Sequence, residues 1–230
     1  KNVVAMFLVC LLLFFLFRGS AKKYKANPLS APSGVQGLLE TVVVYIRDEV
    51  AIPFIGEKKY RKFLPFLLTI FFFILGLNLF GQVPFFGSIN ATGNLTLTMV
   101  LALIVFILVN INGNKDYWGH IFWMPGVPTM IKPVLAGVEI LGLFIKPLTL
   151  MLRLAGNISA GHIAILSFIG LIFIFGDIFG GAGYGVGTVV GSFLTLFMMA
   201  IELIVAFVQA FVFTILTASY IGAATEEHHH

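Results

Sequence analysis

Long runs of apolar residues, separated by short polar stretches, organise this chain. Some runs have the length of one membrane crossing, because about 20 apolar residues in a helix span a bilayer. We predict that residues 1–18, 63–80 and 95–111 form the first, second and third spans. Residues 38–56 instead mix apolar and charged positions, which is typical of a helix lying on the membrane surface.

The first apolar run, Val3 to Phe17, is followed by the basic residues Arg18, Lys22, Lys23 and Lys25. One interpretation is a secretory signal peptide with a cleavage site around Ser20. A retained span fits the basic flank better, because basic residues stop transfer and remain in the cytoplasm. The chain does not begin with Met, so we expect this span to start in a portion further upstream.

Two much longer apolar segments follow, residues 134–175 and 184–224. As a single helix each would be longer than about 60 Å at about 1.5 Å per residue, against a hydrocarbon thickness of about 30 Å. The glycine-rich stretch from Gly180 to Gly185 separates them and lacks the Lys-Ser/Thr of a phosphate-binding loop. We therefore predict a hairpin that turns at this stretch. No proline interrupts Leu148 to Ala224, which favours strongly tilted helices over broken ones.

Composition and charge support a membrane protein. The sequence is 59% hydrophobic and 10% charged, which leaves too little polar surface to cover a soluble core. The formal net charge is +4, but nine of the 14 Lys and Arg residues lie between Arg18 and Lys62. The positive-inside rule puts that segment in the cytoplasm, so the charge indicates topology and not nucleic-acid binding. We predict an all-α membrane protein of one domain, residues 1–230, with five crossings, the N-terminus outside and the C-terminus inside.

Ionisable side chains in the long segments are costly, at about 2.5–3.5 kcal/mol or more each in a bilayer. On a helical wheel of about 100° per residue, a stripe about 80° wide collects five polar residues of the first long segment: Glu139, Lys146, Thr149, Arg153 and Asn157. The second long segment carries a similar polar face with Thr195, Glu202 and Gln209. His162 lies opposite Arg153 on its helix, among small residues that permit close helix approach.

These residues also have purely structural interpretations. Arg153 could be paired for packing alone, and His162 could be a satisfied core histidine. Glu139 and Lys146 could extend to the membrane interface, and Gln209 could bond a neighbouring helix. We favour a functional site, because scattered polar residues would rarely share one face of an otherwise apolar helix.

Two motifs carry a family resemblance. The first is KPLTLMLRLAGNISAGH, from Lys146 to His162, and the second is ELIVAFVQAFVF, from Glu202 to Phe213. Shorter matches occur at Asn78-Leu-Phe80 and from Asn94 to Thr98. Together they resemble subunit a of F-type ATP synthases over nearly the whole chain.

This resemblance implies residue roles and partners. Arg153 would be the essential arginine that faces the carboxylate of the rotating c-ring, with Asn157 and Gln209 as polar neighbours. His162 and Glu202 match a proton-path pair that appears in reverse order in some members. The implied partners are the c-ring, subunit b of the peripheral stalk, the rest of the ATP synthase, the lipid bilayer and the translocated H⁺. The chain would not be an enzyme by itself, since ATP is made in a separate catalytic head.

Physical chemistry agrees with these roles. A c-ring carboxylate in lipid must be protonated, and an opposing arginine lowers its pKa and releases the proton. Two half-channels must then reach Arg153 from opposite sides. Glu139 lies about 21 Å before it and His162 about 13 Å after it along the helix. We assign Glu139 to the inner path and His162 with Glu202 to the outer one, and we include Lys146 and Thr149 in the proton path.

Other interpretations remain open at this point. A secondary ion or solute transporter would show repeats and broken helices, and a membrane anchor would not need buried Arg, His and Glu. The cell inner membrane of a bacterium is favoured over the mitochondrial inner membrane, and coupling to H⁺ or Na⁺ is undecided. Cys10 cannot form an internal disulfide. We predict no cofactor and no metal site, the terminal His228–His230 run included.

Overall fold

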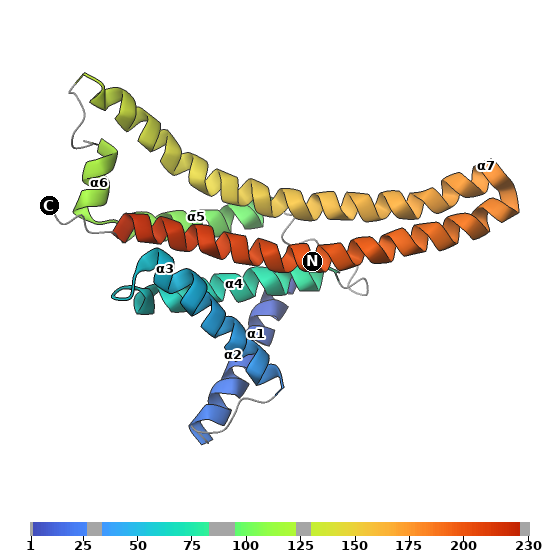
Figure 1. Cartoon of the computed structure of the whole chain (residues 1–230), viewed down its shortest axis with the longest axis horizontal. Helices are drawn as coiled ribbons and strands as arrows, with labels where there is room; N and C mark the ends of the chain where they lie inside the picture. Colours follow the sequence, from blue (N-terminus) through green and yellow to red (C-terminus); the bar gives the residue numbers. More distant parts are fainter. Residues whose placement is uncertain (1, 27–33, 83–94, 123–129, 226–230) are drawn as a thin grey trace.

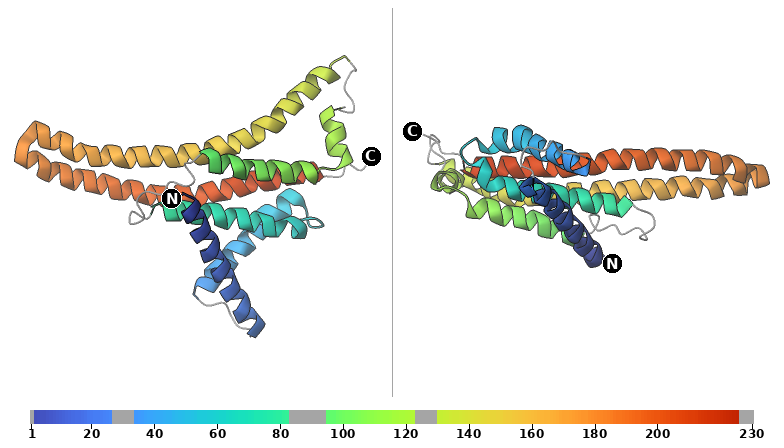
Figure 2. Two further views of the ribbon diagram at one scale, coloured as in Figure 1. Left: turned by 180° about the vertical axis from the view of Figure 1, so that it is seen from behind. Right: turned by 90° about the horizontal axis from the view of Figure 1, so that it is seen from below.

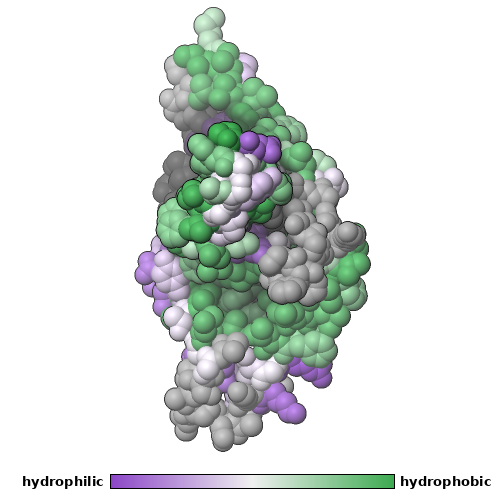
Figure 3. All heavy atoms as spheres, turned by 90° about the vertical axis from the view of Figure 1, so that its right-hand side faces the viewer, coloured by the Kyte–Doolittle hydropathy of each residue, from purple (hydrophilic) through white to green (hydrophobic). Residues whose placement is uncertain are grey.

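A computed structural model describes residues 2–26, 34–82, 95–122 and 130–225. The regular secondary structure of these residues is entirely helical, which confirms the predicted all-α fold class. A very long helical hairpin runs the length of the molecule, and the shorter helices pack toward one end of it (Figure 1). Seen from the hairpin turn, hydrophobic residues cover most of the surface, with hydrophilic ones in small separate groups (Figure 3).

The helices follow the apolar runs of the sequence. In chain order they are α1 (Asn2–Ala26), α2 (Val35–Ile46), a π-helical stretch (Arg47–Ala51), α3 (Ile52–Ile55), α4 (Tyr60–Gln82), α5 (Leu95–Ile111), α6 (Lys115–Phe122) and α7 (Lys132–Thr225). By length and composition, the segments able to cross a membrane are Val3–Lys22, Tyr60–Gln82, Lys132–Arg153 and Ser159–Thr225. Helix α5 is a shorter apolar helix of 17 residues. The chain is therefore a multi-pass membrane protein.

The predicted surface helix over residues 38–56 corresponds to α2, the π-helical stretch and α3 taken together. Its apolar side is buried, with Ile46 and Val50 fully covered. Its opposite side carries an exposed ion pair between Arg47 and Asp48, at 2.7 Å. One face packs on the protein, whereas the exposed positions include apolar side chains such as Leu38 as well as this ion pair, so the location of the helix on the membrane surface stays a prediction.

Helix α1 packs across α4 and is joined to α2. Gly76 of α4 permits the close approach, since a Cβ there would stand 2.8 Å from Val9 Cγ1. The rings of Phe17 and Phe72 meet edge to face, with 5.1 Å between centroids. At its C-terminal end, α1 is linked to α2 because the Tyr24 hydroxyl donates a hydrogen bond to the Glu40 carboxylate.

Helices α4 and α5 pack along the C-terminal part of α7 and form the core there (Figures 1 and 2). Phe71 and Ile74 of α4, Val105 of α5 and Phe213 of α7 are almost completely buried. The part of the hairpin nearest its turn extends beyond these helices (Figure 1). That part exposes large apolar side chains such as Phe193, as expected for a surface in contact with lipid.

Helix α7 reverses direction at Gly180, where φ is 63° and ψ is −143°. The reversal divides it into a first arm, residues 132–179, and a second arm, residues 181–225. The sequence predicted a turn over the whole stretch from Gly180 to Gly185, but residues 181–185 are helical. One residue with positive φ is enough to reverse the chain, and glycine adopts that conformation without steric cost.

The two arms pack closely near the turn because glycines replace side chains between them. Gly183, Gly187 and Gly191 are spaced four residues apart and form a stripe that we call the glycine stripe. A Cβ at Gly187 would stand 3.1 Å from the Ile172 backbone, and one at Gly191 3.0 Å from the Phe168 carbonyl oxygen. Small residues at this spacing let membrane helices approach to backbone contact. Sequence analysis treated Gly183 only as part of a turn and did not select Gly187 or Gly191.

Hydrogen bonds from Lys59 and Asn114 fix the C-terminal end of α7. The Thr225 carbonyl oxygen accepts hydrogen bonds from Lys59 Nζ, at 2.7 Å, and from Asn114 Nδ2, at 3.0 Å. The Asn114 backbone N–H also donates to the Ala224 carbonyl, at 2.9 Å. A helix end leaves carbonyls unpaired and carries partial negative charge, so a lysine stabilises it. The C-terminal end of the second arm thus lies beside Lys59.

Candidate functional site

Contacts between the two arms set their register. The Glu202 carboxylate lies directly against Gly161, so that a Cβ there would collide with it. Nearer the open end, Lys146 Nζ lies 5.4 Å from the centre of the Tyr220 ring. Arg153 falls between Lys146 and Gly161 on the first arm, and Gln209 falls between Glu202 and Tyr220 on the second. The polar residues of the two arms therefore lie at the same level along the hairpin.

Arg153 has an exposed side chain, and its neighbour Leu152 is 54% exposed on the same apolar surface. Within the described part of the chain, the guanidinium makes no hydrogen bond or ion pair, although its charge acts on Tyr220. Thr149, one turn earlier, is also exposed and bonds only its own helix, from Oγ1 to the Ile145 carbonyl at 2.9 Å. A permanent cation on a membrane-embedded surface needs an anionic partner or water.

The Glu202 side chain is partly buried between the arms. Gly161 is buried beneath it, and only a residue without a side chain leaves room for the carboxylate. The side chains of Asn157 and His162 lie outside the described part of the structure, so their predicted roles stay predictions. Since His162 follows Gly161 directly, its backbone lies next to the Glu202 carboxylate.

Two buried amides lie near this point, and one of them joins α4 to the second arm. Gln209 is 4% exposed, which places its side chain inside the packed helices. Asn78 of α4 is equally buried and donates from Nδ2 to the Ala206 carbonyl, at 3.2 Å. The Asn78 Oδ1 atom has no hydrogen-bond partner among the described residues, and neither does the buried Thr195 Oγ1. These unpaired oxygens are acceptors in an otherwise apolar interior, where such groups normally bind water.

Glu139 and Lys146 lie at the open end of the hairpin, and both are partly buried. Here the start of the first arm diverges from the second arm, and α6 stands beside the opening (Figure 1). Burial raises the pKa of Tyr117 in α6, and the nearby Glu139 carboxylate raises it further. The Tyr117 phenol therefore stays protonated and able to donate. Sequence analysis did not select Tyr117 or Tyr220, because neither belongs to the polar stripe of the first arm.

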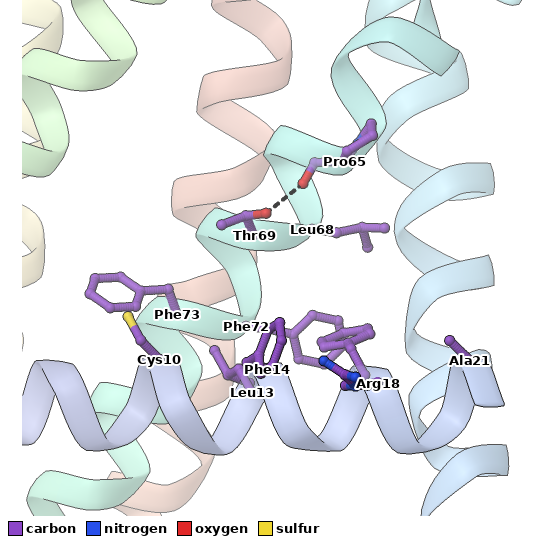
Figure 4. A pocket seen from close by; sticks show the side chains of 11 residues that line it. Cys10, Leu13, Phe14, Arg18, Ala21, Pro65, Leu68, Thr69, Phe72 and Phe73 are labelled. Carbon is purple, nitrogen blue, oxygen red and sulfur yellow. Dashed lines mark hydrogen bonds between the residues drawn. The ribbon is translucent and has the colours of Figure 1, made fainter.

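A separate groove lies between α1 and α4, far from these polar residues in the sequence. Its volume is about 640 Å³, and its lining is almost entirely apolar, including Phe14, Leu68 and Phe73 (Figure 4). The polar groups at its edge are engaged: Arg18 lies over the Phe14 ring, and Thr69 bonds the Pro65 carbonyl at 2.7 Å. This lining offers little for a polar solute. No group of three metal-ligating side chains occurs in the described ranges.

Comparison with known proteins gives a consistent result. The profile of the family described as "ATP synthase A chain" matches residues 3–222. An ATP synthase subunit a from Myxococcus xanthus is 40% identical over 183 residues, which cover 76% of this chain and 58% of that protein. An ATP synthase subunit a 2 from Chlorobaculum tepidum is 40% identical over 233 residues, covering 98% of this chain and 62% of its own length.

A further relative, an ATP synthase subunit a from Chlorobium phaeobacteroides, is 36% identical and covers 100% of this chain and 66% of its own length. The chain thus spans between 39% and 66% of the length of the curated relatives it matches. All of these relatives are bacterial.

Proposed function

The chain belongs to the ATP synthase A chain family, and from this premise we propose that it conducts protons to and from a rotating ring of c subunits. The observation that carries the proposal is Arg153: an exposed cation, unpaired within the described residues, on an apolar surface. A ring carboxylate that passes this surface would be the missing anionic partner. Family membership also favours this function over the secondary transporter that the sequence left open.

Arg153 would act on the ring in two ways. Its charge favours the ionised carboxylate, so the ring site releases its proton as it comes to face the arginine. Arginine is not deprotonated in proteins, so it passes no proton itself and keeps the two sides of the membrane separate. Lysine would be a poorer substitute, because a buried lysine loses its proton far more readily.

Two proton paths would approach Arg153 from opposite ends of the hairpin. The inner path runs from the open end, where Glu139 and Lys146 are partly buried. The outer path lies toward the turn, where the Glu202 carboxylate packs on Gly161 next to His162. Thr149, Asn157 and Gln209 would line the approach to the arginine itself. Because the arms are antiparallel, one hairpin supplies both paths.

The remaining partners follow from the same function. Subunit b of the peripheral stalk would hold the chain still against the ring's torque, and ATP would form in the separate catalytic head. The bacterial relatives favour a cell inner membrane as the location.

Replacing Arg153 tests the proposal. We expect Arg153→Ala to abolish ATP-driven proton pumping in inverted membranes while the complex still assembles, because the side chain is exposed and packs on little. Leu152→Ala is the matched control: it truncates the neighbouring exposed residue and should pump normally. Normal pumping by Arg153→Ala in an assembled complex would refute the proposed function.

A further inference from the structure

A small, partly open cavity lies where the two arms of α7 diverge, against α5 and α6. Its volume is about 20 Å³. A cavity needs about 10–15 Å³ of such space to hold a water molecule, so this one has room for a single water. Most of the lining is apolar, but Asn110, Tyr117, Lys146 and Tyr220 also contribute to it.

The polar atoms at this cavity lack partners. Asn110 donates from Nδ2 to the Phe106 carbonyl, at 2.7 Å, which leaves its buried Oδ1 without a hydrogen bond among the described residues. The buried hydroxyl of Tyr117 is likewise unpaired within the described ranges. A buried polar atom without a partner costs about 1–3 kcal/mol. Two such atoms at one cavity of this size indicate a bound water.

The first arm adds further hydrogen-bonding capacity. Pro147 has no backbone N–H, so the Leu143 carbonyl loses the helical hydrogen bond it would otherwise accept; both residues line the cavity. The Lys146 ammonium lies over the Tyr220 ring, at 5.4 Å from its centre, and can only donate. A water here can accept from Lys146 and donate to Asn110 Oδ1, with Tyr117 as a further partner, which meets the usual requirement of about three hydrogen bonds.

The cavity also lies between the charged groups of the inner path. On one side Tyr117 is close enough to Glu139 to feel its charge. On the other side Tyr220 lies under Lys146 and within the field of Arg153. The order Glu139, Tyr117, cavity, Tyr220, Arg153 therefore connects the open end of the hairpin to the arginine.

We propose that this cavity holds one water molecule that links Asn110, Tyr117 and Lys146, and that this link is the narrowest point of the inner proton path. Tyr117 and Asn110 act as positioning residues that hold the water. The inference rests on the proposed function, since it assigns a place within the inner path. It makes Tyr117, which lies outside both motifs of the sequence, a determinant of proton flux.

The test measures proton pumping by the assembled ATP synthase in variants that lack either the Tyr117 hydroxyl or the Asn110 amide. Tyr117→Phe and Asn110→Leu each take away one partner of the water with little change in volume. We expect each to slow ATP-driven proton pumping by about three- to tenfold, as for the loss of one buried hydrogen bond. The deuterium solvent isotope effect on pumping should rise, because proton transfer at the weakened link becomes slower. Tyr45→Phe is the control, since that hydroxyl is removed outside the cavity, beside Phe211.

A second variant fills the space. Ala102 lines the cavity and is 2% exposed, so Ala102→Leu should expel the water and slow pumping at least as much. A high-resolution structure of the wild-type complex should show one water within hydrogen-bond distance of Asn110 Oδ1 and Tyr117 Oη.

The outcomes separate the two proposals. Wild-type pumping and an unchanged isotope effect in Tyr117→Phe and Asn110→Leu would overturn the water link, even if Arg153→Ala still abolishes pumping. A cavity without water in the high-resolution structure would overturn it as well. Normal pumping by Arg153→Ala would instead overturn the proposed function, whatever the cavity variants do. Reduced assembly of Ala102→Leu leaves the decision to the two conservative variants.

Discussion

Alanine substitutions along the glycine stripe should separate steric cost from helix propensity. At Gly183, an added Cβ would overlap the Phe175 carbonyl and stand 2.8 Å from Phe179 Cβ. Both are close to the helix backbone, so the arms themselves must move apart. Overpacking of this kind costs about 1–3 kcal/mol, which exceeds the gain of about 0.5–1 kcal/mol from replacing a helical glycine by alanine. We expect Gly183→Ala to destabilise the hairpin.

Two neighbouring glycines complete the series. A Cβ at Gly187 would stand 3.1 Å from Ile172 and Phe175, a tight contact that a small shift relieves, so Gly187→Ala should be nearly neutral. A Cβ at Gly185 would meet nothing within 4 Å, so Gly185→Ala should be stabilising by about 0.5–1 kcal/mol. The expected stability order is Gly185→Ala, then Gly187→Ala, then Gly183→Ala, with about 1–3 kcal/mol between the extremes, because the propensity gain is common to all three.

The order can be measured as the temperature at which the chain leaves the purified ATP synthase in mild detergent. Each variant is heated in steps, and the chain retained in the complex is quantified on a native gel. All three glycines lie within five residues of one arm, so differences in expression or insertion should be small. If Gly183→Ala is as stable as Gly185→Ala, close packing at the glycine stripe does not hold the arms together.

Three further predictions concern other parts of the hairpin. His162→Glu and Glu202→His should each impair proton pumping, and the double exchange should recover part of the loss, with a coupling energy of about 0.5–3 kcal/mol. If the double variant pumps no better than the product of the two single effects, the two residues are not a pair. In a background without Cys10, Ala182→Cys should react with an impermeant thiol reagent from outside and Ala223→Cys only from inside, and labelling of both from one side would contradict the topology. Lys59→Met should destabilise the C-terminal end of α7 by about 1 kcal/mol, because it removes a hydrogen bond and a charge at a helix C-terminus; Lys58→Met, at the neighbouring exposed position, is the control for this melting measurement.

Most of the fold could be predicted from the pattern of apolar residues along the chain. Helices formed where the runs were long, because in lipid the backbone must satisfy its own hydrogen bonds. The sequence also indicated the hairpin, since two apolar segments flank a glycine-rich stretch. It did not indicate that Gly181 to Gly185 would continue the helix, because composition alone does not tell which glycine takes the positive φ. Helix α6 lies in a polar stretch and has too weak a pattern to be predicted.

The candidate site was predictable only where its residues share one helix. The stripe that contains Arg153 could be placed on a wheel because all of its members lie on the first arm. Tyr117, Asn110 and Tyr220 come from three different helices, and nothing in their local sequence shows that they meet. The contact between Glu202 and Gly161 depends on the register of the arms, which is set by the turn at Gly180 and by the glycine stripe.

The glycine stripe has a consequence for how the chain folds after insertion. The contacts at Gly191, Gly187 and Gly183 join residues close in sequence, whereas Lys146 and Tyr220 are separated by most of the hairpin. Closing a short loop loses less chain entropy than closing a long one, so pairing begins beside Gly180 and proceeds toward the open end. The cavity and the C-terminal anchor at Thr225 then form last. A substitution that disrupts packing near the turn prevents every later contact between the arms. A substitution at the open end leaves a folded hairpin with an incomplete inner path.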